Sequence, residues 1–476
     1  MPPWVLTEPM AVEPKTRDQR LVLAIAILAS FVTFLDGSVI NVALPAIAEE
    51  FNAGISVQQW VVDAYLVTLG TLILLAGSLS DAFGRIIVLR VGLIGFAVTS
   101  LLIAASPSAE FLIIMRGLQG IAGALLVPSS LALIISTFRG VAQSKAIGQW
   151  TGWTSAAFLA GPLLGGLFVD FLSWRLVFAI NIIPIAVTLV LLARLGQKNE
   201  RPEGAGIDWF GAVLGILGLG GPVFALIEQA NFGWGSPVIY LPFALGLVAL
   251  VAFIVRQRTT RHPMLPLGLF AVRNFSVGNV ATTLVYGALS IGGFLVTVYL
   301  QEVAGYSATF AGLAFLPITI ISILLSSFFG TLAGKYGPRL FMGLGPIVGG
   351  IGYLLMLGIA DDVNYFTQVL PGVVLFAFGL TATVAPLTAA ILGSIPEEQS
   401  GIGSAINNAV SRIAGLITIA LIGVILGGAL TTESLHRGLI VTAALLIAGG
   451  VVSWVGIRNP QAPTSASGPE ETASRE

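Results

Sequence analysis

The chain consists of long apolar runs separated by short polar connections, many of which carry Pro, Gly or Asn. A helix needs about 20 residues to cross the hydrocarbon core of a bilayer, and about fourteen runs approach that length. Because the runs are continuous and do not alternate, they predict helices and argue against a closed β-barrel. The predicted spans are 21–47, 57–77, 86–106, 111–137, 145–169, 176–195, 209–229, 237–256, 276–300, 309–332, 340–360, 367–392, 402–429 and 438–457.

The composition also indicates a membrane protein. Charged residues make up 9% of the 476 residues, against about 25% in soluble proteins. The net charge of −1 gives no indication of nucleic-acid binding, and the absence of Cys excludes disulfides and Cys metal sites. His262 and His436 lie far apart, so we expect no metal and no cofactor. The first apolar run is too long for a signal peptide and is therefore predicted to be an uncleaved span.

The distribution of Lys and Arg predicts the orientation. Of the 22 such residues, eighteen fall in segments on the side of the N-terminus, Arg175 and Arg437 fall on the other side, and Arg116 and Arg412 fall within spans. Basic residues favour the cytoplasmic side, so both termini are predicted to be cytoplasmic. The tail 458–476, rich in Pro, Ser and Glu, is predicted to be disordered.

An internal repeat predicts two related halves. Three residues recur at a constant offset of 253: Gly77, Leu79 and Gly84 return as Gly330, Leu332 and Gly337. The two copies occupy the same place in each half if the spans at 209–229 and 237–256 are an insertion. Repeated halves around a midplane site are typical of secondary transporters. The predicted domains are a cytoplasmic segment 1–20, a six-helix bundle 21–195, two inserted helices 209–256, a six-helix bundle 276–457 and the tail 458–476.

Asp36 lies inside the first apolar run, where a charged side chain costs roughly 2.5–3.5 kcal/mol. At about 1.5 Å per residue, Asp36, Asp63 and Arg116 lie roughly 16, 9 and 8 Å from the outer membrane face. Arg116 is expected to hold one carboxylate ionised, while desolvation and like charge push the other towards its neutral form. These three residues are the predicted proton-coupling groups, with Asp36 as the coupling carboxylate. The alternatives are packing for Asp36, a structural ion pair for Arg116, and a solvated helix start for Asp63.

Four motifs follow one another on the predicted spans: Asp36 to Pro45, Gly77 to Arg90, Arg116 to Gly123, and Gly161 to Gly166. Together they resemble the fourteen-helix drug:proton antiporter branch of the major facilitator superfamily, over about residues 20–458. Trp174, Arg175, Phe178, Asn181 and Pro184 are also typical of it. The resemblance implies an all-α polytopic protein of two pseudo-symmetric six-helix bundles plus two inserted helices. It further implies a bacterial plasma membrane, exchange of protons for a small-molecule substrate, and function as a monomer.

The resemblance also implies roles for other residues. Gating is expected from Gly77, Asp81, Gly84, Arg85, Gly161, Pro162, Gly165 and Gly166. Closely spaced glycines let helices approach and Pro162 permits a kink, although ordinary helix packing is an alternative. The substrate cavity is expected to be lined by Asn41, Gln119, Trp153, Tyr286, Asn407, Asn408 and Arg412. Core packing of the aromatic residues, and a packing or counter-ion role for Arg412, are the alternatives.

The sequence departs from the family pattern at two places. Gly334 stands where the first copy of the loop motif has Asp81, so an ion-pair latch is expected on one side only. The span at 402–429 has no carboxylate, which argues against broad export of dicationic drugs.

The predicted function is proton-driven export of amphiphilic or cationic small molecules. The alternatives are a dedicated exporter of one metabolite, antibiotic or lipid and, more remotely, a non-transporting receptor or scaffold. Without a Walker lysine motif, metal cluster or nucleophile elbow, neither an ATP-driven pump nor an enzyme is expected. Four acidic residues at span ends are predicted to be solvated: Asp170, Asp208, Glu228 and Glu302.

Overall fold

The computed structural model describes residues 16–195, 206–261, 263–396 and 399–459, and within these ranges the chain is helical with no β-strand. The predicted segment 1–20 up to residue 15, and the predicted disordered tail from residue 460, lie outside them. The first half and the insertion contain α1 (Arg17–Glu50), α2 (Ile55–Phe83), α3 (Arg85–Ala104), α4 (Ala109–Thr137), α5 (Gly140–Phe171), α6 (Leu176–Ala179), α7 (Ile182–Ala193), α8 (Trp209–Phe232) and α9 (Pro237–Thr259). The second half contains η1 (Leu267–Ala271), α10 (Arg273–Glu302), α11 (Ala308–Leu313), α12 (Leu316–Tyr336), α13 (Pro338–Leu355), η2 (Met356–Gly358), η3 (Tyr365–Val369), α14 (Leu370–Leu392), α15 (Ser400–Ala420), α16 (Ile422–Leu426) and α17 (Thr432–Gly456).

The predicted polytopic helical fold is confirmed. In the described part of the chain, thirteen helices are long and apolar enough to cross a membrane. The remaining predicted span, 145–169, falls on α5, which is 32 residues long. The sixth span is broken between α6 and α7. Pro184 explains the break, because it lacks the N–H that would bond the carbonyl of Ile180.

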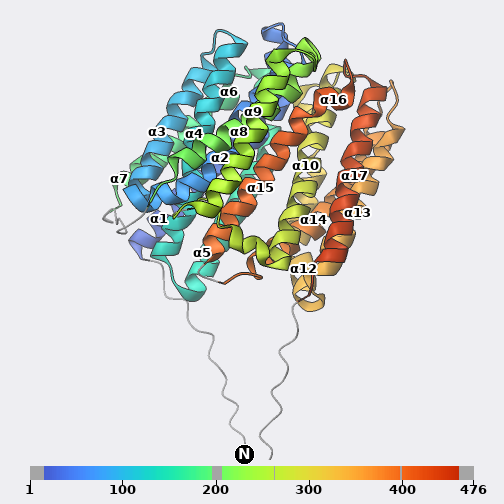
Figure 1. The fold of residues 1–476 in the computed structure, drawn as a ribbon. Coiled ribbons are helices and arrows are strands. Elements are labelled where there is room, and N and C mark those ends of the chain that lie inside the picture. The colour runs from blue at the N-terminus through green and yellow to red at the C-terminus, as the bar shows by residue number, and fades with distance from the viewer. Residues whose placement is uncertain (1–15, 196–205, 262, 397–398, 460–476) are drawn as a thin grey trace, which may run out of the picture.

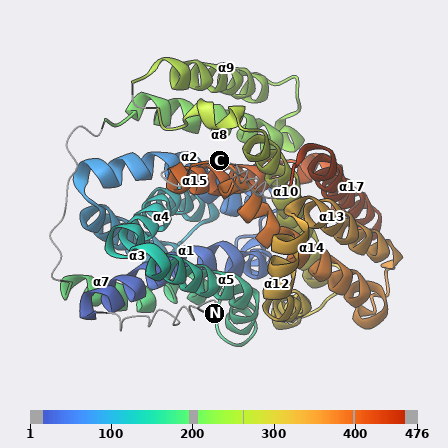
Figure 2. The ribbon, with the colours of Figure 1, turned by 90° about the horizontal axis from the view of Figure 1, so that it is seen from below.

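Two groups of helices lie side by side, with the inserted pair outside them. Helices α1 to α7 form one group and α10 to α17 the other (Figure 1). Figure 2 shows α8 and α9 as an outer layer beside α2 and α15. The helical part of the chain begins and ends at the same end of the bundle, which is lower in Figure 1 and is called the terminal end below. This arrangement has the predicted 6+2+6 form, whereas the predicted domain boundaries stay a prediction.

The sequence repeat coincides with a repeated backbone turn. Gly84 separates α2 from α3 with φ of 90°, and Gly337 separates α12 from α13 with φ of 85°. These two glycines are a matched pair of the 253-residue repeat. The left-handed region costs an L-residue about 1–2 kcal/mol, so each half needs glycine at this turn.

The outward surface of the inserted pair is apolar. On α9, Leu245, Val248 and Val251 are each 65% exposed and recur at helical spacing. A large exposed apolar surface marks an interaction surface. For a helix of this length and composition, the lipid bilayer is the partner that covers this surface.

The turn at Gly84 provides a test of the backbone argument. Gly84→Ala is expected to lower the stability by about 1–2 kcal/mol, because alanine must adopt positive φ. Gly77→Ala on the same helix is expected to be neutral or stabilising by up to about 1 kcal/mol, because a Cβ there meets nothing within 4 Å and Gly disfavours helix. Thermal unfolding of both variants in the same detergent checks the difference, and equal effects would contradict it.

Candidate functional site

A buried ion pair lies between α1 and α4. Nη1 of Arg116 is 2.6 Å from Oδ2 of Asp36, and both side chains are 0% exposed. Two opposite charges removed from solvent attract strongly, but each has also lost its hydration, so the pair is stable only while both partners are present. The depths estimated from the sequence, roughly 16 Å for Asp36, 9 Å for Asp63 and 8 Å for Arg116, put all three in the outer half of the bundle, with Asp63 nearest to the level of Arg116. The structure pairs Arg116 with the deeper Asp36.

Two amides complete the surroundings of the carboxylate. Oδ1 of Asp36 accepts hydrogen bonds from Nε2 of Gln119 at 3.2 Å and from Nδ2 of Asn181 at 3.0 Å. Both amides also donate to Oγ of Ser100 on α3. The carboxylate therefore has donors on both oxygens, from α4 and from the connection between α6 and α7, and Ser100 of α3 holds the two amides.

The guanidinium of Arg116 distributes its donors over several acceptors. Nη1 donates to Oε1 of Gln119 at 2.6 Å as well as to Asp36, and Nε donates to the carbonyl of Val61 at 2.9 Å. Its Cζ lies 4.3 Å from the ring centroid of Tyr65 and 5.6 Å from that of Phe178. A compact ammonium does not reproduce this spread of donors.

Asp63 lies in a different environment. Its side chain is 0% exposed, and neither carboxylate oxygen has a hydrogen-bond partner. The alternative that Asp63 is a solvated helix-start residue is therefore wrong, because neighbouring helices cover this part of α2. An ionised carboxylate without donors is costly in such a place. Asp63 and Arg116 form no ion pair, so the predicted three-residue cluster reduces to the pair Asp36–Arg116 and a separate Asp63.

Asp63 belongs to the α2 face that meets α15. Gln59, one turn away, donates to the carbonyl of Ile419 on α15 at 2.6 Å. Two turns further along this face is Gly70, where a Cβ would lie 3.5 Å from Cβ of Arg412. The spacing 59, 63, 66, 70 is that of one helical face. Asp63 thus lies at the contact between the two halves.

The glycines of α5 allow close approach, as the spacing predicts. A Cβ at Gly161 would lie 2.9 Å from the backbone nitrogen of Val39 on α1, and one at Gly165 would lie 2.8 Å from the carbonyl oxygen of Val39. A Cβ at Gly166 would collide with the backbone of Thr309 on α11, and one at Gly312 would collide with the carbonyl of Pro162. This face of α5 touches both its own half and the other half, while its gating role stays a prediction.

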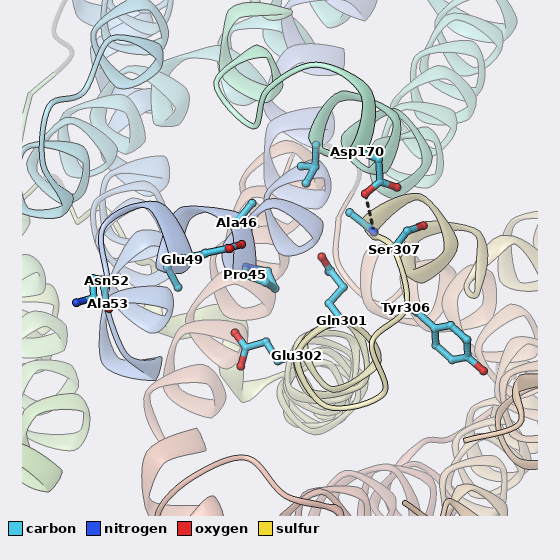
Figure 3. Close-up of a pocket in the computed structure, with 13 residues that line it drawn as sticks. Pro45, Ala46, Glu49, Asn52, Ala53, Asp170, Gln301, Glu302, Tyr306 and Ser307 are labelled. Atoms are coloured by element: carbon cyan, nitrogen blue, oxygen red, sulfur yellow. Dashed lines mark hydrogen bonds between the residues drawn. The ribbon is translucent and has the colours of Figure 1, made fainter. Parts of the chain in front are cut away.

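The end opposite the terminal end joins the halves by hydrogen bonds. The carboxylate of Asp170 accepts from the N–H groups of Ala308 and Thr309 at 2.9 and 2.6 Å, and the first of these bonds is the dashed line in Figure 3. Nε2 of Gln58 donates to Oε1 of Glu302 at 2.6 Å. Glu228 of α8 accepts from Nε1 of Trp60 at 2.7 Å.

A hollow of about 510 Å³ opens beside these contacts, between α1, α5, the end of α10 and the start of α11 (Figure 3). Its lining includes Glu49, Asp170, Gln301 and Glu302. None of the residues predicted for coupling or for the substrate cavity lines it. We therefore place the candidate site at the Asp36–Arg116 pair, on the strength of its chemistry, and not at this hollow.

The predicted cavity residues lie in different environments. Asn407 donates to Oδ1 of Asn279 at 3.2 Å and to Oγ1 of Thr282 at 2.8 Å, which ties α15 to α10. Trp153 is 58% exposed on α5. Asn41, Tyr286 and Asn408 are half-buried. Gln119, in contrast, is fully buried in the ion-pair network and lines no cavity in this conformation, because Asp36 and Ser100 bind its amide.

Of the predicted gating loop, Gly84 is the turn residue and Arg85 is half-buried at the start of α3. The side chain of Asp81 lies outside the described part of the structure. Arg139, which directly precedes α5, donates from Nη1 to the carbonyl of Ile135, four residues before it.

The prediction that Asp208 is solvated is wrong. Its side chain is 1% exposed, and Nε of Arg256 lies 2.5 Å from Oδ1. Burial acts to raise the pKa of Asp208, but hydrogen bonds from the Gly211 N–H, Arg256 and Gln257 outweigh it, so this pKa lies below its usual value. The pair joins the start of α8 to the end of α9.

Sequence reasoning missed two residues of the site. Ser100 had no assigned role, and Asn181 entered only as part of the family resemblance. A usable signal exists for Asn181, since it is a polar residue between Ile180 and Ile182 in an apolar run. Buried polar groups in such runs need partners, and Asp36 supplies one.

A membrane-spanning bundle of two related helical halves, with an ion pair buried in one of them, defines a polytopic transporter of the secondary type. The sequence model of the Major Facilitator Superfamily matches residues 26–419, and the chain belongs to that family.

Its relatives include resistance and efflux proteins. The chain is 32% identical to the methylenomycin A resistance protein of Bacillus subtilis, over 85% of this chain and 87% of the relative. It is 32% identical to the multidrug efflux pump LfrA of Mycolicibacterium smegmatis, over 85% and 80%. A solved structure of the peptide transporter POT in complex with sulfate shares the fold with a TM-score of 0.67 at 15% identity, covering 91% of this chain and 94% of that one.

Substitution of asparagine for each buried aspartate is expected to lower the stability by very different amounts. Asp36→Asn leaves the charge of Arg116 buried and uncompensated, which costs about 3–5 kcal/mol. Asp63→Asn removes no interaction and is expected to change stability by less than about 1 kcal/mol. Thermal unfolding of both variants at pH 7 in one detergent measures this, and an Asp63→Asn loss as large as that of Asp36→Asn would contradict the assignment.

Proposed function

We propose that the protein is a proton-coupled antiporter that exports amphiphilic small molecules by alternating access. The observation that carries this proposal is the ion pair between Asp36 and Arg116, buried at 0% exposure inside a membrane bundle. The family is one of transporters, and relatives are named for drug efflux and antibiotic resistance. We further propose that the protein has no enzymatic activity and acts as a monomer.

The pair suggests how a proton is exchanged. Protonation of Asp36 removes the negative charge and leaves Arg116 held by Gln119 and Val61 alone. A buried pair that loses one charge becomes unfavourable, so proton binding and the packing of α1 against α4 affect each other. A proton taken up in one conformation and released in the other then drives the cycle, with Asp63 as a second candidate proton carrier.

The contacts at the end opposite the terminal end suggest the gate on that side. Asp170, Gln58 and Gln59 connect the halves there, and the glycine face of α5 packs on α11. We propose that these contacts separate when the site opens to the outside. Gly161, Pro162, Gly165 and Gly166 would serve as the surface on which α5 moves relative to α1 and α11.

A dedicated exporter of one compound is the second candidate. One relative, 32% identical over 85% of this chain and 75% of the relative, is the tetracenomycin C resistance and export protein of Streptomyces glaucescens, whose name specifies a single compound. A proton-driven cycle is common to both candidates, and only the range of substrates separates them.

Proton coupling through Asp36 is tested with reconstituted protein. Asp36→Asn is expected to abolish accumulation of rhodamine B or its ethyl ester into proteoliposomes with an acidic lumen, because the amide carries no proton. Protein-free liposomes give the passive baseline, and Asp362→Asn, an exposed loop aspartate, is the matched control with wild-type accumulation. If Asp36→Asn still concentrates dye against its gradient, the proton site lies elsewhere.

The orientation is also a proposal, supported by the excess of Lys and Arg at the terminal end. A fluorescent-protein fusion after Arg458 is expected to fluoresce and an alkaline phosphatase fusion there to be inactive. A phosphatase inserted after Gly235, between α8 and α9, is expected to be active. The reverse pattern would place both termini outside the cell.

A further inference from the structure

A second arginine lies in the interior of the membrane region, on the other half of the protein. Arg412 is on α15, and its side chain is half-buried. Its Cζ lies 5.3 Å from the ring centroid of Phe34 on α1. A Cβ at Gly37 would lie 3.4 Å from Nη1 of Arg412. The guanidinium therefore reaches across from the second half and rests against α1.

Arg412 has no anionic partner among the residues that the structure describes. The three ion pairs there are Asp36–Arg116, Glu50–Arg175 and Asp208–Arg256. No hydrogen bond of the Arg412 side chain to a described residue is present either. A cation at this depth is costly without a counter-charge, so its retention without one calls for a ligand that brings the charge.

Neither buried aspartate nearby forms an ion pair with Arg412. Asp36 directly precedes Gly37 on α1, but successive residues of a helix point about 100° apart, and Asp36 faces Arg116. Asp63 lies on the α2 face that meets α15, but seven residues before Gly70, the position that touches Arg412. The guanidinium of Arg412 is directed to Gly37 on α1, and it forms no ion pair with Asp63, whose two carboxylate oxygens have no hydrogen-bond partner.

The surroundings of Arg412 suit a flat apolar molecule with a polar end. Phe34 presents its ring to the guanidinium. The charges of Asp36, Arg412 and Arg116 all act on the hydroxyl group of Tyr65 on α2, and the charge of Arg412 also acts on that of Tyr286 on α10. Asn41 lies one turn from Gly37 on the same α1 face and is half-buried, with no hydrogen bond of its side chain to a described residue.

We infer that Arg412 binds the anionic group of the transported molecule, a carboxylate or another acidic oxygen, while Phe34 and Tyr286 contact its aromatic or aliphatic body. This inference rests on the proposed function and narrows its cargo to amphiphiles that carry a negative charge. It departs from the cationic cargo that the family resemblance implies. It also gives a physical account of the missing carboxylate on α15: a cation-binding site would need one, and this helix carries an arginine.

The inference is tested with two dyes that differ in one charge. Rhodamine B has a free carboxylate, and its ethyl ester has the same ring system without it. Binding of each to purified protein in nanodiscs at pH 7.5 is measured by fluorescence anisotropy. A charge-assisted hydrogen bond in a partly desolvated site is worth about tenfold or more in affinity, so the wild type is expected to bind the acid at least that much more tightly than the ester.

Variants test whether Arg412 is the residue that causes tighter binding of the carboxylate dye. Arg412→Gln is expected to bind acid and ester equally, with the ester affinity unchanged, and Arg412→Lys to keep part of the preference because it retains the charge. Arg437→Gln removes a positive charge from an exposed position on α17 and is the matched control with the full preference. Thermal unfolding of each variant verifies that it is folded.

Several outcomes would overturn the inference. The inference is wrong if the wild type binds acid and ester equally or binds neither dye. It is also wrong if the Arg412→Gln protein still prefers the acid. Equal weakening of both dyes by Arg412→Gln would assign Arg412 to conformational balance, for example as a partner of Asp63 in the other state. The proposed function fails separately, when the wild type accumulates neither dye under a proton gradient while the carboxylate preference in binding persists.

Discussion

A charge excluded from both water and lipid must find its opposite inside the protein, and the pair Asp36–Arg116 meets that requirement. Each of the two buried charges is stable only while the other is present. Hydrogen bonds from Gln119 and Asn181 orient the carboxylate, so α1, α4 and the start of α7 are held in one arrangement. In the proposed cycle the same dependence would couple a proton to the helices, because neutralising Asp36 would remove one partner of the pair that holds them together.

One turn of α1 touches the three parts of the molecule that the proposed cycle involves. Asp36 faces α4, Gly37 lies against Arg412 of α15, and Val39 packs on the glycines of α5. Because these residues are consecutive or nearly so, a shift of α1 by a fraction of a turn changes all three contacts at once. The proposed proton site, the proposed cargo site and the α5 surface that is proposed to move are therefore connected by one short segment of backbone.

The sequence was most informative for properties that depend only on position along the chain. Length and hydropathy located the spans, and the helical rise placed Asp36, Asp63 and Arg116 in the outer half of the bundle, without deciding which carboxylate pairs with Arg116. It failed where burial depends on neighbours distant in sequence. Asp208 was judged by its place at a span end, yet Arg256, 48 residues later, pairs with it. A solvated helix start was kept as the alternative for Asp63 for the same reason, and Gln119 was placed on a cavity wall although Ser100 and Asp36 bind it. The identity of these partners is set by helix packing, which periodicity alone does not give.

The repeat at Gly84 and Gly337 shows two halves that share a backbone turn, yet their interiors have diverged in charge. In the described part of the chain, the buried carboxylates within spans, Asp36 and Asp63, belong to the first half, while Arg412 belongs to the second. A duplicated architecture whose copies specialise in this way becomes modular in evolution. If the proposed roles are correct, recombination near the inserted helices would exchange the half that binds the cargo and keep the half that binds the proton, so a new substrate range would need one crossover in place of many point changes.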